Sequence, residues 1–438
     1  MTVRPETEER AGAPGPLGPR LRSARRRKGL TQAQLASPDY SVAYVSRIES
    51  GERTPSPEAL GAFARRLGIS PDVLLSPVDA ATLLELERLK VEALVGIDEA
   101  RWDQARAAAS AMLALAQRHE LSDFVSLAKR YLGELEERIG DVEVALAFYD
   151  QAAVAGAGMG VEDRGDMTVR LARLHRRMGD LGYSADLLTR AIDALASESD
   201  LYPALTARLF LHLSATCSER GDYARARRTG LEAIEWARKA GDTRTLASAL
   251  WAAAPPMAVA DPARALSLIR RAGTLFAELG LTHELGRLQA TLGETALAAG
   301  DEPTARVALD RAMELIGPSA PPSVLSTILL SQAELHRRDG DTDEAARLAG
   351  QVIALAEGVE PLEQARARRV LGESIRSQDP EAAERELRAA TELFTSAGAQ
   401  MDAARCFRSL GDLLIAQGRT DEALAVFRDG LGAVEGAA

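Results

Sequence analysis

Apolar positions near the start of the chain recur at helical spacing and predict a small helical head. Within residues 31–51, Val45 and Ile48 lie three positions apart, on one face of a helix that Ser41 caps and Gly51 ends. A shorter helix precedes it, and a polar turn joins the two. Two short helices connected in this way predict a helix-turn-helix, in which the second helix is free to enter a DNA groove.

Three further helices complete the expected head. They are predicted over 17–28, 57–67 and 72–75, from apolar residues on one side and from Ser-Pro pairs that start the last two. The head is therefore expected to be a five-helix domain over 17–76. Residues 1–16 are rich in Pro, Gly, Glu and Arg and nearly devoid of apolar residues, so we expect a disordered tail there.

From residue 80 onward, a repeating pattern replaces the single helices. A glycine or small residue followed by a polar one recurs every 38 to 42 residues, at Gly140-Asp141, Gly179-Asp180, Gly221-Asp222, Ala260-Asp261, Gly300-Asp301, Gly340-Asp341, Gln378-Asp379 and Gly418-Arg419. Small residues often stand seven positions before this turn, and Ala or Ser stands five positions after it. Small residues let two antiparallel helices approach closely, so the pattern predicts a solenoid of helix pairs.

The expected array extends over residues 80–436. A degenerate first unit over 82–118, with its turn near Arg101, brings the total to about nine helix pairs. The period and the small-residue code resemble those of the tetratricopeptide repeat, which implies a right-handed α-solenoid; HEAT or armadillo repeats are the structural alternative. The fold class is thus predicted to be all-α, a helix-turn-helix head followed by a tetratricopeptide-like array.

Three breaks interrupt the array. The segments 156–160 and 317–322 are rich in Gly and Pro and are expected to be linkers between repeats, and candidate hinges. Pro255 and Pro256 fall in the last turn of a first helix, which must stop or kink there. Either a shortened helix or a flexing point of the superhelix would result.

Composition supports this architecture and divides the chain by charge. Apolar residues make up 46% and aromatic residues 4%, as expected of helices packed through Ala and Leu. The whole chain carries a net charge of −11, yet residues 17–69 contain ten basic and four acidic side chains, a net charge of +6. A small basic head on a large acidic body indicates a nucleic-acid-binding module attached to a body that does not bind nucleic acid.

No apolar run long enough for a membrane span and no signal-peptide pattern occurs, so we expect a soluble, cytoplasmic protein without membrane contacts. The two cysteines, Cys217 and Cys406, lie in separate helical patterns and are expected to be buried free thiols. There is no phosphate-binding loop, nucleophile elbow or Cys/His spacing that fits a metal. We therefore expect no enzyme, no metal site and no cofactor.

The head resembles one known family. It shares with lambda-repressor-like (XRE) domains the pattern Leu21, Arg25, Gly29-Leu30-Thr31-Gln32, Leu35-Ala36, Ser41, Val45-Ser46, Ile48-Glu49-Ser50-Gly51, Arg53, Pro55, Leu60, Ala64 and Leu67-Gly68-Ile69. The glycine usual in the turn is replaced by Ser37-Pro38-Asp39, and Tyr40 takes the apolar position before the cap. The resemblance implies a DNA-binding domain that presents its second motif helix to the major groove.

The candidate DNA contacts follow from the helical register and from this resemblance. The second motif helix turns Val42, Ala43, Ser46 and Arg47 toward the groove, and Arg47 can offer a two-pronged donor to guanine. Family resemblance places phosphate and base contacts at the start of the preceding helix, while Glu49 is expected to pair with Arg22 or Arg25. The full set of candidates is Arg25, Arg26, Gln32, Gln34, Ser41, Val42, Ala43, Ser46, Arg47, Arg53 and Thr54.

A ligand of the array is expected on what we call the inner face, the side of each first helix that carries the residues 3, 6, 10 and 13 positions before the turn. This register selects Arg130, Glu134, Glu137, Arg173, Arg176, Arg208, Arg287, Glu294, Glu334, Arg337, Arg405, Arg408 and Asp412. Their arginine excess suits a ligand with a carboxylate, including a peptide C-terminus. The alternative is a solvated face connected by internal ion pairs.

An XRE head followed by a tetratricopeptide array resembles the peptide-sensing RRNPP regulators. In that family, asparagines of the concave face hold the peptide backbone, but this chain contains no asparagine. The sequence therefore predicts a transcriptional regulator that binds a palindromic operator in double-stranded DNA as a homodimer. A peptide or small molecule bound by the array would control the spacing of the two heads. The alternative is an adaptor whose array docks a partner protein while the head tethers it to DNA.

Overall fold

The computed structural model describes residues 17–69, 71, 74, 78, 80–156, 160–258, 260–317, 322–356 and 360–435. Contacts divide the chain into two compact units, Met1–Leu135 and Glu136–Ala438. The expected tail over 1–16 lies outside the described residues, as do most of the expected helix over 72–75 and the centres of the linkers at 157–159 and 318–321. The sequence places the end of the head at residue 76 and the start of the array at residue 80. Residues 75–77 and 79 lie outside the described residues, so this boundary stays a prediction.

The head has the helices that its sequence pattern predicts. The described ones are α1 (Leu17–Arg27), α2 (Gln32–Ala36), α3 (Val42–Glu49) and α4 (Pro57–Leu67). They enclose one core, to which Leu21, Leu35, Val45, Ile48 and Phe63 contribute fully buried side chains. Polar residues start three of these helices: the hydroxyls of Thr31, Ser41 and Ser56 each accept a hydrogen bond from a backbone N–H of the first turn.

The rest of the described chain forms nine helix pairs, from α6/α7 to α22/α23, as the repeat predicted. The first unit contains α6 (Ala80–Asp98), α7 (Trp102–Arg118) and most of α8 (Ser122–Ile139). The second contains α9 (Val142–Ala155), α10 (Val161–Arg177), α11 (Leu181–Leu195), α12 (Pro203–Arg220), α13 (Tyr223–Ala240), α14 (Thr243–Ala253), α15 (Pro262–Glu278), α16 (Thr282–Ala298), α17 (Glu302–Ile316), α18 (Pro322–Asp339), α19 (Thr342–Ala356), α20 (Pro361–Ile375), α21 (Pro380–Ala397), α22 (Gln400–Ala416) and α23 (Thr420–Glu435).

The Gly-Asp signal of the repeat has two separate physical causes. The glycines adopt the left-handed backbone that ends the first helix, as at Gly221 with φ of 87°. The aspartate then caps the second helix: the carboxylate of Asp222 accepts a hydrogen bond of 2.9 Å from the amide of Arg225, and the turns at 141, 180, 261, 301, 341 and 379 repeat this bond. Each turn therefore stops one helix and starts the next.

Small residues allow the paired helices to touch, as predicted. The hydroxyl of Ser184 donates to the carbonyl oxygen of Ala172 on the facing helix at 2.8 Å. At Gly411 an added Cβ would lie only 2.4 Å from the ring of Phe427, so no larger residue fits there without a shift. None of the helices in the described ranges has the length and apolar content needed to cross a bilayer.

The double proline shortens a helix. Helix α14 ends at Ala253, and a single 3₁₀ turn over Pro255–Met257 follows it. Proline lacks the N–H that a further helical turn would need, which explains the early stop. Of the two outcomes left open by the sequence, the shortened helix is the one observed.

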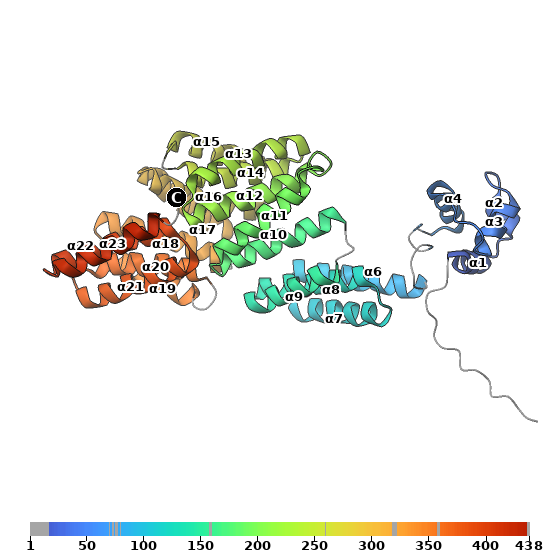
Figure 1. Cartoon of the computed structure of the whole chain (residues 1–438), viewed down its shortest axis with the longest axis horizontal. Helices are drawn as coiled ribbons and strands as arrows, with labels where there is room; N and C mark the ends of the chain where they lie inside the picture. Colours follow the sequence, from blue (N-terminus) through green and yellow to red (C-terminus); the bar gives the residue numbers. More distant parts are fainter. Residues whose placement is uncertain are drawn as a thin grey trace, which may run out of the picture. The chain divides into compact units, whose positions relative to one another are not determined.

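The second unit closes on itself, which the repeat pattern does not predict. Leu181, at the start of α11, is fully buried in a cluster formed otherwise by α20, α21 and α22, including Leu362 and Phe394. The guanidinium of Arg177 lies 3.0 Å from the carboxylate of Glu360. The green and the orange-red helices of Figure 1 therefore meet, although these residues are 183 positions apart. We call this contact the closure.

We expect Gly221→Ala to loosen the closure, with Gly300→Ala as a matched control. Both glycines have positive φ, so each alanine costs about 1–2 kcal/mol of backbone strain. Only at position 221 would the added Cβ also collide, lying 2.5 Å from Cγ and 3.2 Å from the backbone nitrogen of Met401; at position 300 it meets nothing. Hydrogen–deuterium exchange should therefore rise in α22 for Gly221→Ala alone. Equal exchange of α22 in both variants would contradict the closure.

Candidate functional site

Helix α3 is fixed to the head by one side and exposes the other. Val45 and Ile48 are fully buried, whereas the opposite side carries the four exposed residues Val42, Ala43, Ser46 and Arg47. Val42 keeps 47% of its surface open to water, so its methyl groups are accessible from the outside of the head. The structure thus presents the side of α3 that the sequence assigned to the groove.

A buried ion pair holds α3 against α1. The guanidinium of Arg25 donates to both carboxylate oxygens of Glu49, at 2.6 and 2.9 Å, and also to the carbonyl oxygen of Leu30 at 2.8 Å. The side-chain amide of Gln32 donates to the same carboxylate at 2.8 Å. Burial raises the pKa of Glu49, but the hydrogen bonds from Arg25 and Gln32 outweigh it and hold this pKa below its usual value.

Two of the candidate DNA contacts, Arg25 and Gln32, instead form hydrogen bonds inside the head. Arg25 is buried and its guanidinium is committed to Glu49 and Leu30, so it does not present its charge to a phosphate. Gln32 uses its amide nitrogen in the same network. The expected pairing of Glu49 with a first-helix arginine is present, and Arg22 approaches the same carboxylate at 3.4 Å. For this reason, neither Arg25 nor Gln32 is among the proposed DNA contacts.

The unusual turn between α2 and α3 is held by an arginine and an aromatic group. Arg66 donates to the carbonyl oxygen of Leu35 at 2.7 Å and also pairs with Asp39, which satisfies the end of α2. Tyr40, which follows the turn, stacks on Tyr44 with ring centres 5.3 Å apart and packs against the ring of Phe63. These contacts replace the glycine turn usual in the family.

The remaining candidate DNA contacts of the head are exposed. The guanidinium of Arg53 lies over the ring of Tyr44, 4.8 Å from its centre, which limits the directions in which it can reach. The hydroxyl of Ser41 and the side-chain oxygen of Gln34 take part in caps of α3 and α2. Arg26 and Thr54 are also exposed.

Most charged residues selected for the inner face of the second unit have an ion-pair partner, either another selected residue or a neighbouring carboxylate. Nη2 of Arg173 lies 2.7 Å from both carboxylate oxygens of Glu137. Four further arginines have a carboxylate partner, namely Arg176 with Glu219, Arg208 with Asp166, Arg337 with Glu334 and Arg405 with Asp402. In the first unit, Arg130 lies over the ring of Tyr131, 5.4 Å from its centre, on the same helix as Glu134. The face carries an ion-pair network, which was one of the two alternatives.

Sequence reasoning missed one row of inner-face residues, those nine positions before the turn. This row contains Arg170, His212, Trp251, Thr291, Ser331, Arg369 and Ser409. Its members contact other first helices: the indole N–H of Trp251 donates to the hydroxyl of Thr291 at 2.9 Å, and Ser409 donates to Glu373 at 2.7 Å. At 3.6 residues per turn, positions nine and ten before the turn both belong to this side, and counting both would have revealed the row.

We distinguish two neighbouring parts of the inner face. The arginine sector contains Arg173, Arg176, Arg208, His212 and Arg287, and the acidic sector contains Glu294 and Glu363. In the arginine sector, burial and the nearby Arg176, Arg173 and Arg208 lower the pKa of His212 to about 3. In the acidic sector, burial raises the pKa of Glu363 to about 7, against the lowering effect of its partner Arg366. Desolvation by the surrounding helices also raises the pKa of Glu294 in this sector, although part of its surface is accessible. Helices α10, α12, α16 and α20 thus bring like charges together.

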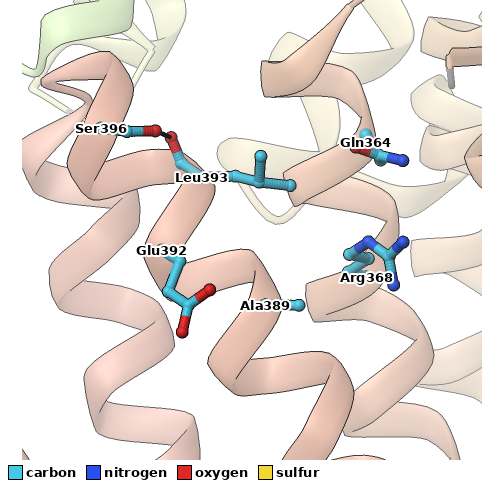
Figure 2. Close-up of a pocket in the computed structure, with 6 residues that line it drawn as sticks. All are labelled: Gln364, Arg368, Ala389, Glu392, Leu393 and Ser396. Carbon is cyan, nitrogen blue, oxygen red and sulfur yellow. Dashed lines mark hydrogen bonds between the residues drawn. The ribbon is translucent and has the colours of Figure 1, made fainter. Parts of the chain in front are cut away.

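A shallow depression elsewhere on the array has no comparable chemistry. It lies between α20 and α21 and is lined by Gln364, Arg368, Ala389, Glu392, Leu393 and Ser396 (Figure 2). The hydroxyl of Ser396 donates to the carbonyl oxygen of Leu393 at 2.9 Å, and Arg368 pairs with Glu386 at 2.6 Å. Because these groups already have protein partners, we do not treat the depression as a ligand site.

Comparisons with known proteins agree with this division into a head and an array. A family described as a helix-turn-helix domain matches residues 16–76, and one described as a tetratricopeptide repeat matches residues 328–363. An uncharacterized HTH-type transcriptional regulator, y4dJ of Sinorhizobium fredii (strain NBRC 101917 / NGR234), is 38% identical over 64 residues, which are 14% of this chain and 83% of the relative.

A solved structure shares the fold of the array, and a second one is similar to part of the chain. A Rap protein complexed with Competence and Sporulation Factor superposes with a TM-score of 0.59 at 13% identity, over 80% of this chain and 98% of that protein. PlcR of Bacillus thuringiensis, in complex with the peptide PapR7 and DNA, gives a TM-score of 0.47 at 17% identity, over 60% of this chain and 95% of that one.

We expect Glu49→Gln to destabilise the head by about 3–5 kcal/mol, because it leaves the buried Arg25 without a counter-charge. Faster hydrogen exchange in α1 and α3 of the full chain would report this loss. Glu52→Gln removes an exposed carboxylate three residues away and should change stability by less than about 0.5 kcal/mol. If the two variants exchanged alike, the buried pair would not hold the head together.

The same carboxylate should make the head sensitive to acid. Since the pKa of Glu49 is lower in the folded head than in the unfolded chain, its contribution is fully present above the ordinary value of about 4.3. That contribution is lost as the pH falls through the lower, folded value. Exchange in α3 should thus accelerate more on acidification in the parent than in Glu49→Gln. An identical pH dependence of the two proteins would rule out this linkage.

Proposed function

Because this chain belongs to the helix-turn-helix transcriptional regulators, we propose that it binds double-stranded DNA through α3 and regulates transcription in response to a ligand of its array. The observation that supports this most directly is the exposed side of α3. That side is held rigidly by Val45, Ile48 and the Arg25–Glu49 pair, so its side chains approach a groove as one preformed surface.

Arg47 is the proposed reader of base edges. It is exposed on α3, and its planar group can donate two hydrogen bonds to a guanine. Ser46 can hydrogen-bond a base, while Val42 and Ala43 can contact only thymine methyl groups. Direct readout would therefore be modest, and much of the affinity would come from phosphate contacts. Arg26, Gln34, Ser41, Arg53 and Thr54 are the exposed residues proposed for those contacts.

Two heads would provide the specificity that one lacks. We propose a homodimer on a palindromic operator, with half-sites about one helical turn, roughly 34 Å, apart. A fixed distance between two modest readers discriminates more strongly than either reader alone. This arrangement makes the separation of the heads the quantity that a ligand would control.

The array is proposed to sense that ligand. Its fold likeness to a Rap protein that was crystallised with Competence and Sporulation Factor supports a solenoid able to hold a ligand. The charged inner face favours a peptide or small molecule with ionised groups. We further propose that the closure opens and closes, so that a ligand with higher affinity for one of these two states would shift their populations.

We expect Arg47→Ala to weaken operator binding by about 5- to 150-fold, since one two-pronged arginine contact contributes about 1–3 kcal/mol of discrimination. The operator would first be identified by genome-wide mapping of bound sites. Fluorescence anisotropy with operator and scrambled duplexes would then give both Kd values. The loss should be confined to the operator, because the contact reads a base.

Arg65→Ala is the matched control, since it removes the same charge from an exposed position on α4. It should change operator and scrambled binding little and equally. A protein that lacks residues 1–76 should bind neither duplex. Specific binding by that truncated protein would refute the proposed role of the head.

A further inference from the structure

Five arginines selected for the inner face of the second unit have a carboxylate partner, namely Arg173, Arg176, Arg208, Arg337 and Arg405. No described carboxylate pairs with the other two, Arg408 and Arg287, and of these two it is Arg287 that lies against an aromatic ring. It extends from α16 and is exposed, yet within the described ranges no carboxylate lies at ion-pair distance from it. The one described carboxylate that raises the pKa of Arg287 is that of Glu284, and this carboxylate already pairs with Arg244 at 2.7 Å. The neighbouring Arg173, Arg176 and Arg208 all have acidic partners, so Arg287 carries the uncompensated charge of the arginine sector.

An indole ring holds this guanidinium in place. Arg287 lies over the ring of Trp251, 5.2 Å from its centre. The ring is itself fixed, because its N–H donates to Thr291 and its plane meets the ring of Phe276 edge-on, at 6.1 Å and 89°. Trp251 occupies the last turn of α14, the helix that the double proline shortens. A guanidinium covered on one face by an aromatic ring keeps its N–H edges free to donate.

The electrostatic surroundings favour an anion at this position. Although the surface of Arg287 is accessible, the protein around it removes part of its hydration, which lowers its pKa, and the charges of Arg173 and Arg176 lower that pKa further. His212, in the same sector, has its pKa lowered by burial and by three of these arginines. Several positive groups thus repel one another in a partly desolvated place, and an added oxyanion would relieve that repulsion.

We propose that Arg287, positioned on Trp251, is the subsite that receives an oxyanion, a carboxylate or a phosphate, of the ligand bound to the inner face. This inference rests on the proposed ligand-sensing role of the array. The inference narrows that role in two ways. The ligand must carry an anionic group, and this group must lie between α14 and α16, near the arginines of α10. Arg287 itself makes the contact, and Trp251 is a positioning residue.

The fluorescence of Trp251 can report anion binding at Arg287. In the full chain with Trp102→Phe and Trp236→Phe, the indole under Arg287 is the one remaining tryptophan. Its emission would be followed at constant ionic strength during titration with three probes. These are inorganic phosphate, N-acetylalanine, which carries a carboxylate, and N-acetylalanine amide, which is the same molecule without a charge. The first two probes distinguish a phosphate ligand from a carboxylate ligand.

A saturable change with phosphate or N-acetylalanine, and none with the amide, is the expected result. Arg287→Gln should weaken the response at least about tenfold, and Arg287→Lys, which keeps the charge and guards against a folding defect, should weaken it less. Arg311→Gln, at an exposed arginine of α17, should leave it unchanged. A response that is equal for the amide, or that survives in Arg287→Gln, would overturn the subsite.

Operator affinity, measured separately, distinguishes failure of the subsite from failure of the proposed function. If Trp251 responds to the anion while the operator Kd does not change at saturation, the subsite stands and the regulatory link between array and head fails. If Trp251 gives no response while the operator is still bound, the subsite fails and the DNA-binding function stands.

Discussion

The close contact between the two helices of each pair is the constraint on which the array depends. A helix pair can bury a continuous apolar face only if its backbones approach closely, and that approach requires small residues on either side of the turn. Gly411 under the ring of Phe427 and Ser184 bonded to Ala172 show the two ways in which this is achieved. Because these positions accept so little variation, the charged residues that can vary are confined to the surfaces. This is why the proposed function assigns ligand binding to the inner face of the array.

In the head, arginines have different roles depending on whether they are buried. Arg25 and Glu49 are buried together, where desolvation makes each depend on the other, while Arg47 and Arg53 stay in contact with water. The first kind of arginine fixes the orientation of α3, and the second kind is available to DNA. Identical side chains thus divide between support and recognition according to burial alone. On the inner face a different property, the presence of a carboxylate partner, separates Arg173, which Glu137 neutralises, from Arg287.

Features determined by nearby residues could be predicted from the sequence, and features determined by distant ones could not. The helix starts at Thr31, Ser41 and Ser56, the buried side of α3 and the nine helix pairs all follow from local spacing. The burial of Arg25 against Glu49 could not be predicted with certainty from the sequence. Glu49 lies 24 residues away, and several arginines of the first helix could have paired with it. Nothing in the sequence indicated the closure, since no periodicity links Leu181 to α20–α22. The family matches confirm the two domain types and leave the site residues as proposals.

The closure also constrains how this array can fold and how it can have evolved. An open solenoid is quasi-one-dimensional: each repeat contacts only its neighbours, and units can be added or removed at little cost. Here Arg177 and Glu360 join the third helix pair to the eighth, so the intervening repeats form a circuit of defined length. Inserting or deleting one repeat would misalign the two ends of that circuit. The closure therefore fits one number of repeats, and unfolding is expected to be cooperative across the circuit instead of proceeding repeat by repeat.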